Sequence, residues 1–180
     1  MENEVRSSFL YAAAGVLLIL AWVTWFLETP GSIEWLQWMG WVIGAGGILL
    51  IGLALLTLHL RGQPEEGQGV TQPLVVVDSG IYALIRHPLY LGWILVYTGV
   101  MAVGQYCLTV LLCLLGIGCV SVICRQEDRR LLERFGSRYE AYLDSVPAMN
   151  LVAGLMRWIS RKRQARQKST RDDGQEPKTA

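Results

Sequence analysis

Two long stretches with almost no charge dominate this chain of 180 residues. Residues 88–124 contain no Asp, Glu, Lys or Arg, and residues 7–60 contain only Glu28, Glu34 and His59 as acidic or basic residues. A helix that crosses a bilayer needs about 20 apolar residues, and a soluble domain usually carries about 25% charged residues. Here only 17% of the residues are charged and 52% are hydrophobic. The sequence therefore predicts an all-α integral membrane protein.

Short polar breaks divide the apolar residues into about four predicted transmembrane helices. Gly104 and Gln105 leave room only for a tight hairpin between the last two. The second predicted helix contains Gly40-x-x-x-Gly44, a spacing that lets two helices approach closely because the glycines have no side chains. The predicted spans are residues 9–27, 35–60, 88–104 and 106–124.

Basic residues alternate between the predicted loops. Arg6 precedes the first span, Arg61 and Arg86 lie in the middle loop, and 13 Lys or Arg residues lie from Arg125 onward. The other two loops have none, and positive residues favour the cytoplasmic side. We therefore expect a multi-pass protein of the cell or inner membrane with both termini and the middle loop in the cytoplasm. The basic C-terminal region is expected to meet membrane lipids, and no nucleic-acid partner is predicted.

After Cys124 the pattern changes to that of a cytoplasmic amphipathic helix, residues 126–146, which Pro147 ends. A second amphipathic helix is predicted over residues 151–159. Residues 1–160 form one predicted domain, and residues 161–180 are predicted to be a disordered basic and polar tail. The apolar face of the first of these helices consists of Leu131, Phe135, Tyr139, Tyr142 and Val146.

Arg86, His87 and Pro88 stand where the middle loop meets the third predicted span. Pro88 suits the first position of a helix and holds His87 in an extended conformation. The start of a helix favours anions, so Arg86 and His87 could bind an anionic group there. A simpler alternative is an arginine that sets the topology beside an interfacial histidine.

Glu127 and Asp128 directly follow the fourth predicted span and lie at the edge of the apolar face, in line with Leu131 and Phe135. The alternative is an ordinary solvated run of charges paired along one helix. The four cysteines all lie between residues 107 and 124 without metal-ligand spacing, and no metal site is predicted.

These two polar segments resemble the two motifs of the isoprenylcysteine carboxyl methyltransferase and phospholipid methyltransferase superfamily, which consists of integral membrane enzymes. The resemblance covers residues 74–147, and the two motifs occur in the family's order. Asp128 stands where the family usually has a second Glu, which is longer by one methylene. The first motif is Gly80-Ile81-Tyr82-x-x-Ile85-Arg86-His87-Pro88-x-Tyr90-x-Gly92. The second is Glu127-Asp128-x-x-Leu131-x-x-x-Phe135-Gly136-x-x-Tyr139-x-x-Tyr142-x-x-x-Val146-Pro147.

The resemblance implies transfer of a methyl group from S-adenosylmethionine to a lipophilic acceptor at the cytoplasmic face. The acceptor could be an isoprenylated cysteine carboxylate, a phospholipid amine or another small lipophile. Glu127 would act on the cofactor or the acceptor, and Arg125 is a further catalytic candidate on the acceptor side. The residues implied for the cofactor are Tyr82, Arg86, His87, Tyr90, Gly92, Glu127 and Asp128.

Two other functions fit parts of the same pattern. Steroid reductases that use NADPH share an Arg-x-Pro-Tyr-like motif with this superfamily, although the segment from Glu127 to Gly136 resembles them less. A non-enzymatic accessory protein on the same scaffold would bind neither cofactor. The sequence leaves the acceptor and the oligomeric state open.

Overall fold

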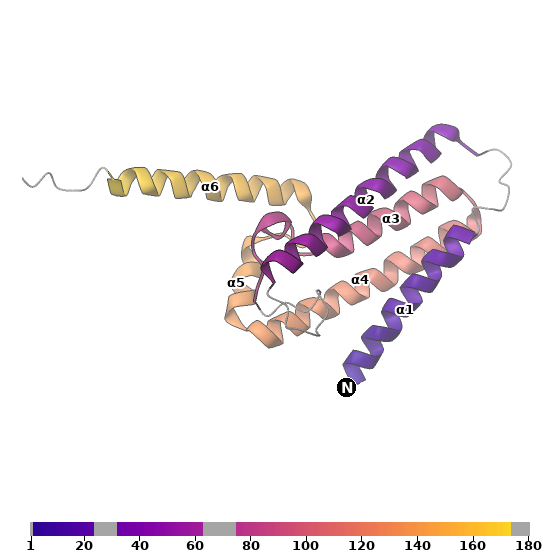
Figure 1. The fold of residues 1–180 in the computed structure, drawn as a ribbon, viewed down its shortest axis with the longest axis horizontal. Coiled ribbons are helices and arrows are strands. Elements are labelled where there is room, and N and C mark those ends of the chain that lie inside the picture. Colours follow the sequence, from indigo (N-terminus) through magenta and orange to yellow (C-terminus); the bar gives the residue numbers. More distant parts are fainter. Residues whose placement is uncertain (1, 24–31, 63–74, 174–180) are drawn as a thin grey trace, which may run out of the picture.

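The computed structural model describes residues 2–23, 32–62 and 75–173, with the side chains of residues 11–23, 32–62 and 75–163. All regular elements within these ranges are helical (Figure 1). The predicted all-α fold class is therefore confirmed for this part of the chain. The helices are α1 (Glu2–Val23), α2 (Glu34–Arg61), the short 3-10 helix η2 (Gly80–Ala83), α3 (Pro88–Gly104), α4 (Cys107–Phe135), α5 (Ser137–Ser145) and α6 (Leu151–Asp173).

Helices α2 and α3 pack closely because glycines face glycines along their contact. A Cβ atom on Gly47 would lie 2.7 Å from the carbonyl oxygen of Gly92, and one on Gly99 would lie 2.7 Å from that of Gly40. Such contacts are shorter than any real side chain allows, so the two backbones touch directly. The close approach predicted at Gly40 is confirmed, and Gly44 also faces Gly99.

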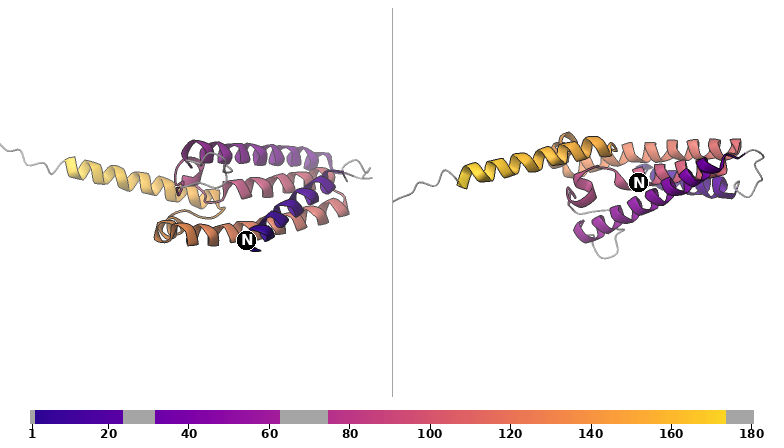
Figure 2. Two further views of the ribbon diagram at one scale, coloured as in Figure 1. Left: turned by 60° about the horizontal axis from the view of Figure 1, so that its bottom comes forward. Right: turned by 90° about the horizontal axis from the view of Figure 1, so that it is seen from above.

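Helices α1 and α4 form the second pair, and α3 contacts α4 between the two pairs. Tyr97 of α3 is buried at the centre of this contact. Its ring lies against Gly116 of α4, and its hydroxyl donates a hydrogen bond to the carbonyl oxygen of Ala14 in α1. Helix α1 packs mainly on α4, so α1 and α2 stand apart along most of their length and meet where the rings of Trp22 and Trp41 touch (Figures 1 and 2).

Helices α2 and α4 are long and apolar enough to cross a membrane, and α1 and α3 contribute shorter apolar stretches, Tyr11–Val23 and Pro88–Gly104. Large apolar side chains on the outside of the bundle support a lipid-facing surface: Val42 is 71% exposed, Leu49 65% and Leu115 52%. The apolar part of α4 ends near Cys124, and its residues 125–135 are mostly polar.

The hairpin predicted at Gly104 and Gln105 is present. Gln105 has a φ of 47°, in the left-handed region, and ends α3. Its side-chain amide donates to the carbonyl oxygen of Ile33 and its amide oxygen accepts from the Ile33 backbone N–H. This pair of bonds ties the start of α2 to the α3–α4 hairpin at one end of the bundle. The starts of α1 and α3 and the ends of α2 and α4 lie at the other end (Figure 1).

The helix boundaries match the prediction for α2 and α3 and differ elsewhere. Helix α4 continues without a break from the membrane segment to Phe135, because residues 125–135 are mainly Arg, Glu and Leu, which are good helix formers. The predicted helix 126–146 is therefore two helices, divided at Gly136, whose φ of 54° no other residue type adopts easily. The end of the predicted first span, residues 24–27, lies outside the described residues.

The C-terminal helix is longer than predicted. Helix α6 runs from Leu151 to Asp173 and leaves the bundle at the end opposite the α3–α4 hairpin (Figure 2). Residues 161–173 are therefore helical, where the sequence predicted a disordered tail. Polarity suggested disorder, but Arg, Lys, Gln and Ala dominate residues 161–168 and all have high helix propensity.

The glycine contact between α2 and α3 is tested by two neighbouring alanine substitutions. We expect Gly47→Ala to destabilise the protein by about 1–3 kcal/mol, since the new methyl group meets backbone atoms of α3. Gly46→Ala is the matched control, because no atom lies within 4 Å of its Cβ position, and stability should be unchanged or slightly higher. Thermal unfolding in detergent measures both. Equal melting temperatures for the two variants would contradict the packing described here.

Candidate functional site

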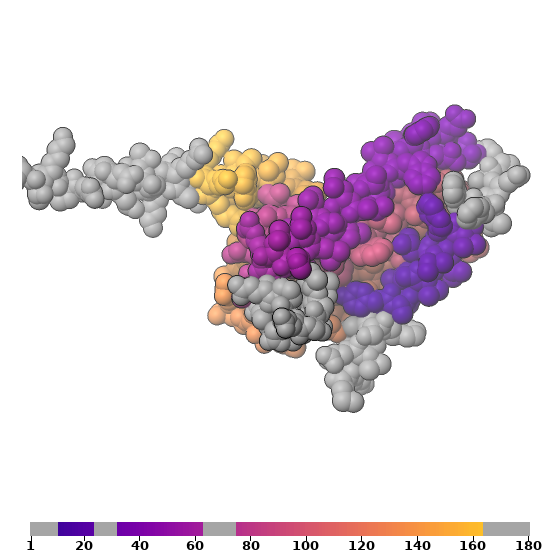
Figure 3. Space-filling view, in the orientation of Figure 1, coloured from indigo at the N-terminus to yellow at the C-terminus, as the bar shows by residue number. Residues whose placement is uncertain are grey.

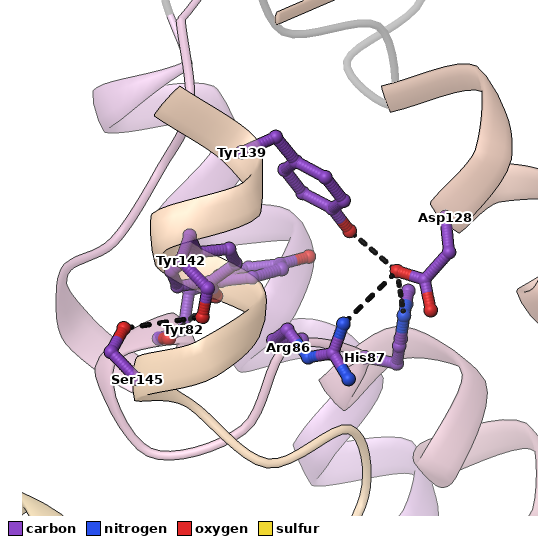
Figure 4. Close-up of polar contacts among 7 residues, drawn as sticks. All are labelled: Tyr82, Arg86, His87, Asp128, Tyr139, Tyr142 and Ser145. Atoms are coloured by element: carbon purple, nitrogen blue, oxygen red, sulfur yellow. Dashed lines mark hydrogen bonds and ion pairs between the residues drawn. The ribbon is translucent and has the colours of Figure 1, made fainter. Parts of the chain in front are cut away.

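The candidate site begins at Asp128, one turn beyond the apolar part of α4. Its Oδ1 atom accepts hydrogen bonds from His87 Nε2 at 2.8 Å and from the Tyr139 hydroxyl at 2.6 Å. Arg86 Nη1 approaches the same oxygen at 3.4 Å. The three donors come from the segment before α3 and from α5, so one carboxylate joins three parts of the chain (Figure 4).

These donors control the charge of Asp128. Burial alone would raise its pKa, but the hydrogen bonds from His87 and Tyr139 and the positive charge of Arg86 lower the pKa to about 2. Asp128 is therefore a carboxylate at neutral pH. Burial, together with the same bond to Asp128, raises the pKa of Tyr139, so that this tyrosine stays protonated as a donor.

The backbone fixes Arg86 and His87 from the other side. The Arg86 N–H donates to the carbonyl oxygen of Pro147 and the His87 N–H to that of Ala148, both at 3.0 Å. Pro88 is the first residue of α3, as predicted. The two backbone N–H groups just before α3 are therefore used by the α5–α6 connection, and an anion would meet the Arg86 side chain rather than these amides.

A cavity of about 690 Å³ opens beside this cluster. One wall is apolar and comes from α2 and α3, with Ile51, Leu55, Leu58, Leu89 and Trp93. The space-filling view shows α3 at the bottom of a hollow between α1 and α2 (Figure 3). The polar and charged lining residues are Tyr11, Tyr82, Arg86, His87, Tyr90, Glu127, Arg130, Arg134, Tyr139 and Tyr142.

Besides Tyr139, the hydroxyl groups of three tyrosines are fixed around this cavity. The Tyr142 hydroxyl donates to the carbonyl oxygen of Tyr82 at 2.7 Å. The hydroxyls of Tyr11 in α1 and Tyr90 in α3 lie 2.9 Å apart and share a hydrogen bond. Burial, followed by the charge of Glu127, raises the pKa of Tyr82 above its ordinary value. These groups therefore offer neutral hydroxyls at any physiological pH.

Glu127 differs from its neighbour Asp128 although both are acidic. Burial raises the pKa of Glu127, and the nearby charges of Arg130 and His87 only partly oppose this. Its Oε2 lies 3.8 Å from Nη1 of Arg130, and its side chain is 22% exposed. Glu127 thus lines the cavity as a carboxylate with increased affinity for a proton.

Arg86 has one atom without a partner. Among the described residues, its Nε is the one buried side-chain nitrogen or oxygen that makes no hydrogen bond. A buried N–H without an acceptor is costly, and a guanidinium binds carboxylates through two parallel bonds. Because Arg86 lines the cavity, its guanidinium could bind a ligand carboxylate there.

Most of the residues predicted for the site do meet there. Tyr82, Arg86, His87, Tyr90 and Glu127 line the cavity, and Asp128 binds two of them. Gly92 and Arg125 do not line the cavity. A Cβ atom on Gly92 would meet Ile51 and the carbonyl oxygen of Gly47, so this glycine serves the α2–α3 contact. Arg125 is exposed and is not among the cavity residues.

Five polar residues that line the cavity were not assigned to the site from the sequence: Tyr11, Arg130, Arg134, Tyr139 and Tyr142. Tyr139 and Tyr142 were placed on the apolar face of a helix, and they do form an apolar cluster with Val146, but their hydroxyls reach polar partners beyond it. Arg130 follows Glu127 by three residues, and this spacing is a usable signal. Tyr11 gave no signal, because its partner Tyr90 is 79 residues away.

Known proteins similar to this chain are methyltransferases by name. Methanethiol S-methyltransferase 2 of Bradyrhizobium diazoefficiens is 29% identical over 94% of the chain and 66% of its own length. Protein-S-isoprenylcysteine O-methyltransferase of Xenopus laevis is 28% identical over 71% of the chain and 46% of its own length. The protein of the same name from Schizosaccharomyces pombe is 35% identical over 41% of the chain and 32% of its own length.

These names support the resemblance to the isoprenylcysteine carboxyl methyltransferase family. The chain spans between about half and two thirds of the length of methanethiol S-methyltransferases 1 and 2 of Bradyrhizobium diazoefficiens. No family model matches it. No solved structure matches it either.

The role of Asp128 in holding the site is tested by its pH dependence. Because its pKa is lowered, the carboxylate stabilises the folded state above pH 3.8, the ordinary pKa, and this contribution is lost as the pH falls toward about 2. We expect Asp128→Asn to cost about 1–2 kcal/mol at pH 7 and roughly half of that at pH 3. Thermal unfolding in detergent at both pH values measures the difference.

Asp144→Asn serves as the control, since its carboxylate is exposed on α5. It should change stability little at either pH. A cost of Asp128→Asn that is the same at pH 3 and pH 7 would show that its charge does not hold the cluster.

Proposed function

We propose that this protein transfers a methyl group from S-adenosylmethionine to a lipophilic acceptor. The observation that carries the proposal is a cavity lined on one side by Arg86 and other fixed polar groups and on the other by an apolar wall. The names of the similar proteins support a methyltransferase. The cavity volume of about 690 Å³ lies in the range typical of small-molecule sites.

The residues on the polar side suit this cofactor. S-adenosylmethionine supplies a methyl group on a positively charged sulfur, and it carries an amino acid carboxylate and ribose hydroxyls. Arg86 would bind the carboxylate through the guanidinium that Asp128 holds in place. Tyr82, Tyr90 and His87 would meet the remaining polar groups. Since methyl transfer depends mainly on alignment, a rigid cluster of this kind suits the reaction.

The apolar wall would hold the acceptor. Ile51, Leu55 and Trp93 give it a surface that favours an aliphatic or prenyl group over a polar one. The named relatives point to a thiol or to the carboxylate of an S-isoprenylcysteine. These two acceptors make different demands, because a neutral thiol must lose a proton and a carboxylate must not.

Glu127 would accept the proton that a thiol must lose. Its raised pKa makes it a better proton acceptor than an ordinary glutamate, and it lines the same cavity as the apolar wall. A carboxylate acceptor would instead be repelled by Glu127 and attracted by Arg130 and Arg134, which are also in the lining. We favour a thiol as the acceptor because Glu127 lines the same cavity as the apolar wall, where a carboxylate can accept a proton from a thiol.

The position of the site also supports the proposed topology. The candidate site lies at the end of the bundle where α2 and α4 end and α3 begins (Figure 1). Its loops hold the basic residues Arg61 and Arg86 and the basic C-terminal region. We propose that four helices, α1 to α4, cross the membrane and that this end faces the cytoplasm.

Cofactor binding is the first test. We expect isothermal titration of the detergent-purified protein with S-adenosylhomocysteine to show saturable binding that Arg86→Gln weakens at least about 100-fold, as loss of a buried charged bond would. Arg129→Gln is the control, because Arg129 is exposed in the polar part of α4 and lies outside the cavity lining. NADPH is titrated in parallel. Binding of NADPH alone would support a reductase, and binding of neither would support a non-enzymatic role.

The acceptor is tested by Glu127→Gln, which keeps the shape of the side chain and removes the base. We expect the rate of methyl transfer to a long-chain alkyl thiol to fall about 100-fold or more, while transfer to a prenylcysteine carboxylate changes little. In the native protein the thiol reaction should slow as the pH falls through the raised pKa of Glu127, because only the ionised form accepts a proton. An equal loss with both acceptors would show that Glu127 binds the cofactor rather than the acceptor's proton.

A further inference from the structure

A second hollow, of about 470 Å³, lies on the other side of Tyr142 from the cavity of the candidate site. It is formed where the segment around η2 meets α5 and α6. The two hollows share only Val76 and Tyr142 among their lining residues, and neither Arg86 nor Glu127 lines the second one. Nothing in the proposed methyl transfer uses it.

This second hollow is basic. Arg138 of α5 and Arg161 and Lys162 of α6 line it, and Asp78 is the one acidic residue in its lining. Three positive charges therefore face one negative charge. Because the three come from two helices, they surround the hollow instead of forming a row along one solvated helix face.

Two of the basic side chains are fixed by neighbours. Arg161 Nη2 donates to the carbonyl oxygen of Ala83 at 2.7 Å, which joins α6 to η2. The Lys162 ammonium lies 4.2 Å from the ring centroid of Trp158, a cation–π contact. Trp158 also lines the hollow, and indole rings are favoured at the level of lipid headgroups.

The first turns of α6 carry an apolar surface beside the hollow. Val152 is 70% exposed, Met156 65% and Leu155 48%. Helix α6 as a whole contains seven Lys or Arg residues and two Asp. Exposed apolar residues next to a basic group are typical of segments that contact an anionic membrane surface.

We propose that the hollow between η2, α5 and α6 binds a phosphate group, supplied by the headgroup of an anionic phospholipid. Arg138, Arg161 and Lys162 would bind its oxygens, and the exposed apolar residues of α6 would lie against the acyl chains. Its position at the polar end of apolar helices places the hollow where such headgroups lie. Occupancy would hold α6 against α5, next to Tyr142 and the candidate site.

The test compares lipids on delipidated, detergent-purified protein. Dioleoyl phosphatidylglycerol should raise the midpoint of thermal unfolding by roughly 5 °C near 100 times its Kd, whereas dioleoyl phosphatidylcholine should not. The double variant Arg138→Gln with Lys162→Gln should lose more than half of this rise. The matched control, Arg129→Gln with Arg163→Gln, removes two exposed positive charges that do not line the hollow, and it should keep the rise.

Inorganic phosphate, titrated separately, distinguishes the source of the group. A rise with phosphate equal to that with phosphatidylglycerol, lost in the same variant, would support a phosphate site filled by the free anion. Equal rises with both lipids, or equal losses in both double variants, would overturn the proposal, since the effect would then be non-specific. If the double variant does not fold, Lys162→Gln alone serves, because Lys162 is exposed and contacts only Trp158 among the interactions described above.

Discussion

The hydrogen bonds to one oxygen atom of Asp128 determine how the polar end of this protein is assembled. Asp128 stands on α4, His87 and Arg86 stand just before α3, and Tyr139 stands on α5. The low pKa that results keeps the carboxylate charged, so all of these donors stay bound at physiological pH. A group of donors fixed in advance costs little further entropy when a ligand binds beside it.

The cavity itself depends on how the four apolar helices pair. Glycines allow α2 to pack closely on α3, and α1 packs on α4. The bundle therefore consists of two tight pairs rather than four equivalent helices. The space between α1 and α2 is therefore less completely filled than the other contacts, and the apolar wall of the cavity faces it (Figure 3). Tyr11 and Tyr90 bridge the pairs near the polar end. An apolar molecule dissolved in the bilayer would meet this side of the bundle directly.

The sequence predicted what depends on composition and local pattern. The limits of α2 and α3, the Gly104-Gln105 hairpin and the glycine contact followed from charge-free runs and residue spacing. Five candidate residues, from Tyr82 to Glu127, share one cavity. The placements that the sequence did not show have a common cause, since they concern long-range packing. Gly92 faces α2, Arg125 faces outward, and Tyr11 pairs with Tyr90 across the bundle, and none of these directions is visible in one helix alone. The helical state of residues 161–173 was missed because polarity was weighed above helix propensity.

The contrast between Glu127 and Asp128 shows how adjacent acids acquire different roles. Consecutive residues on a helix point about 100° apart, so Asp128 turns toward three donors while Glu127 turns into the cavity. Hydrogen bonds overcome burial at Asp128, and burial prevails at Glu127, which moves the two pKa values in opposite directions. A lowered pKa suits a group that must stay charged to hold others in place. A raised pKa suits a group that takes and releases a proton, and this separation is the strongest physical reason to look for an acceptor that must be deprotonated.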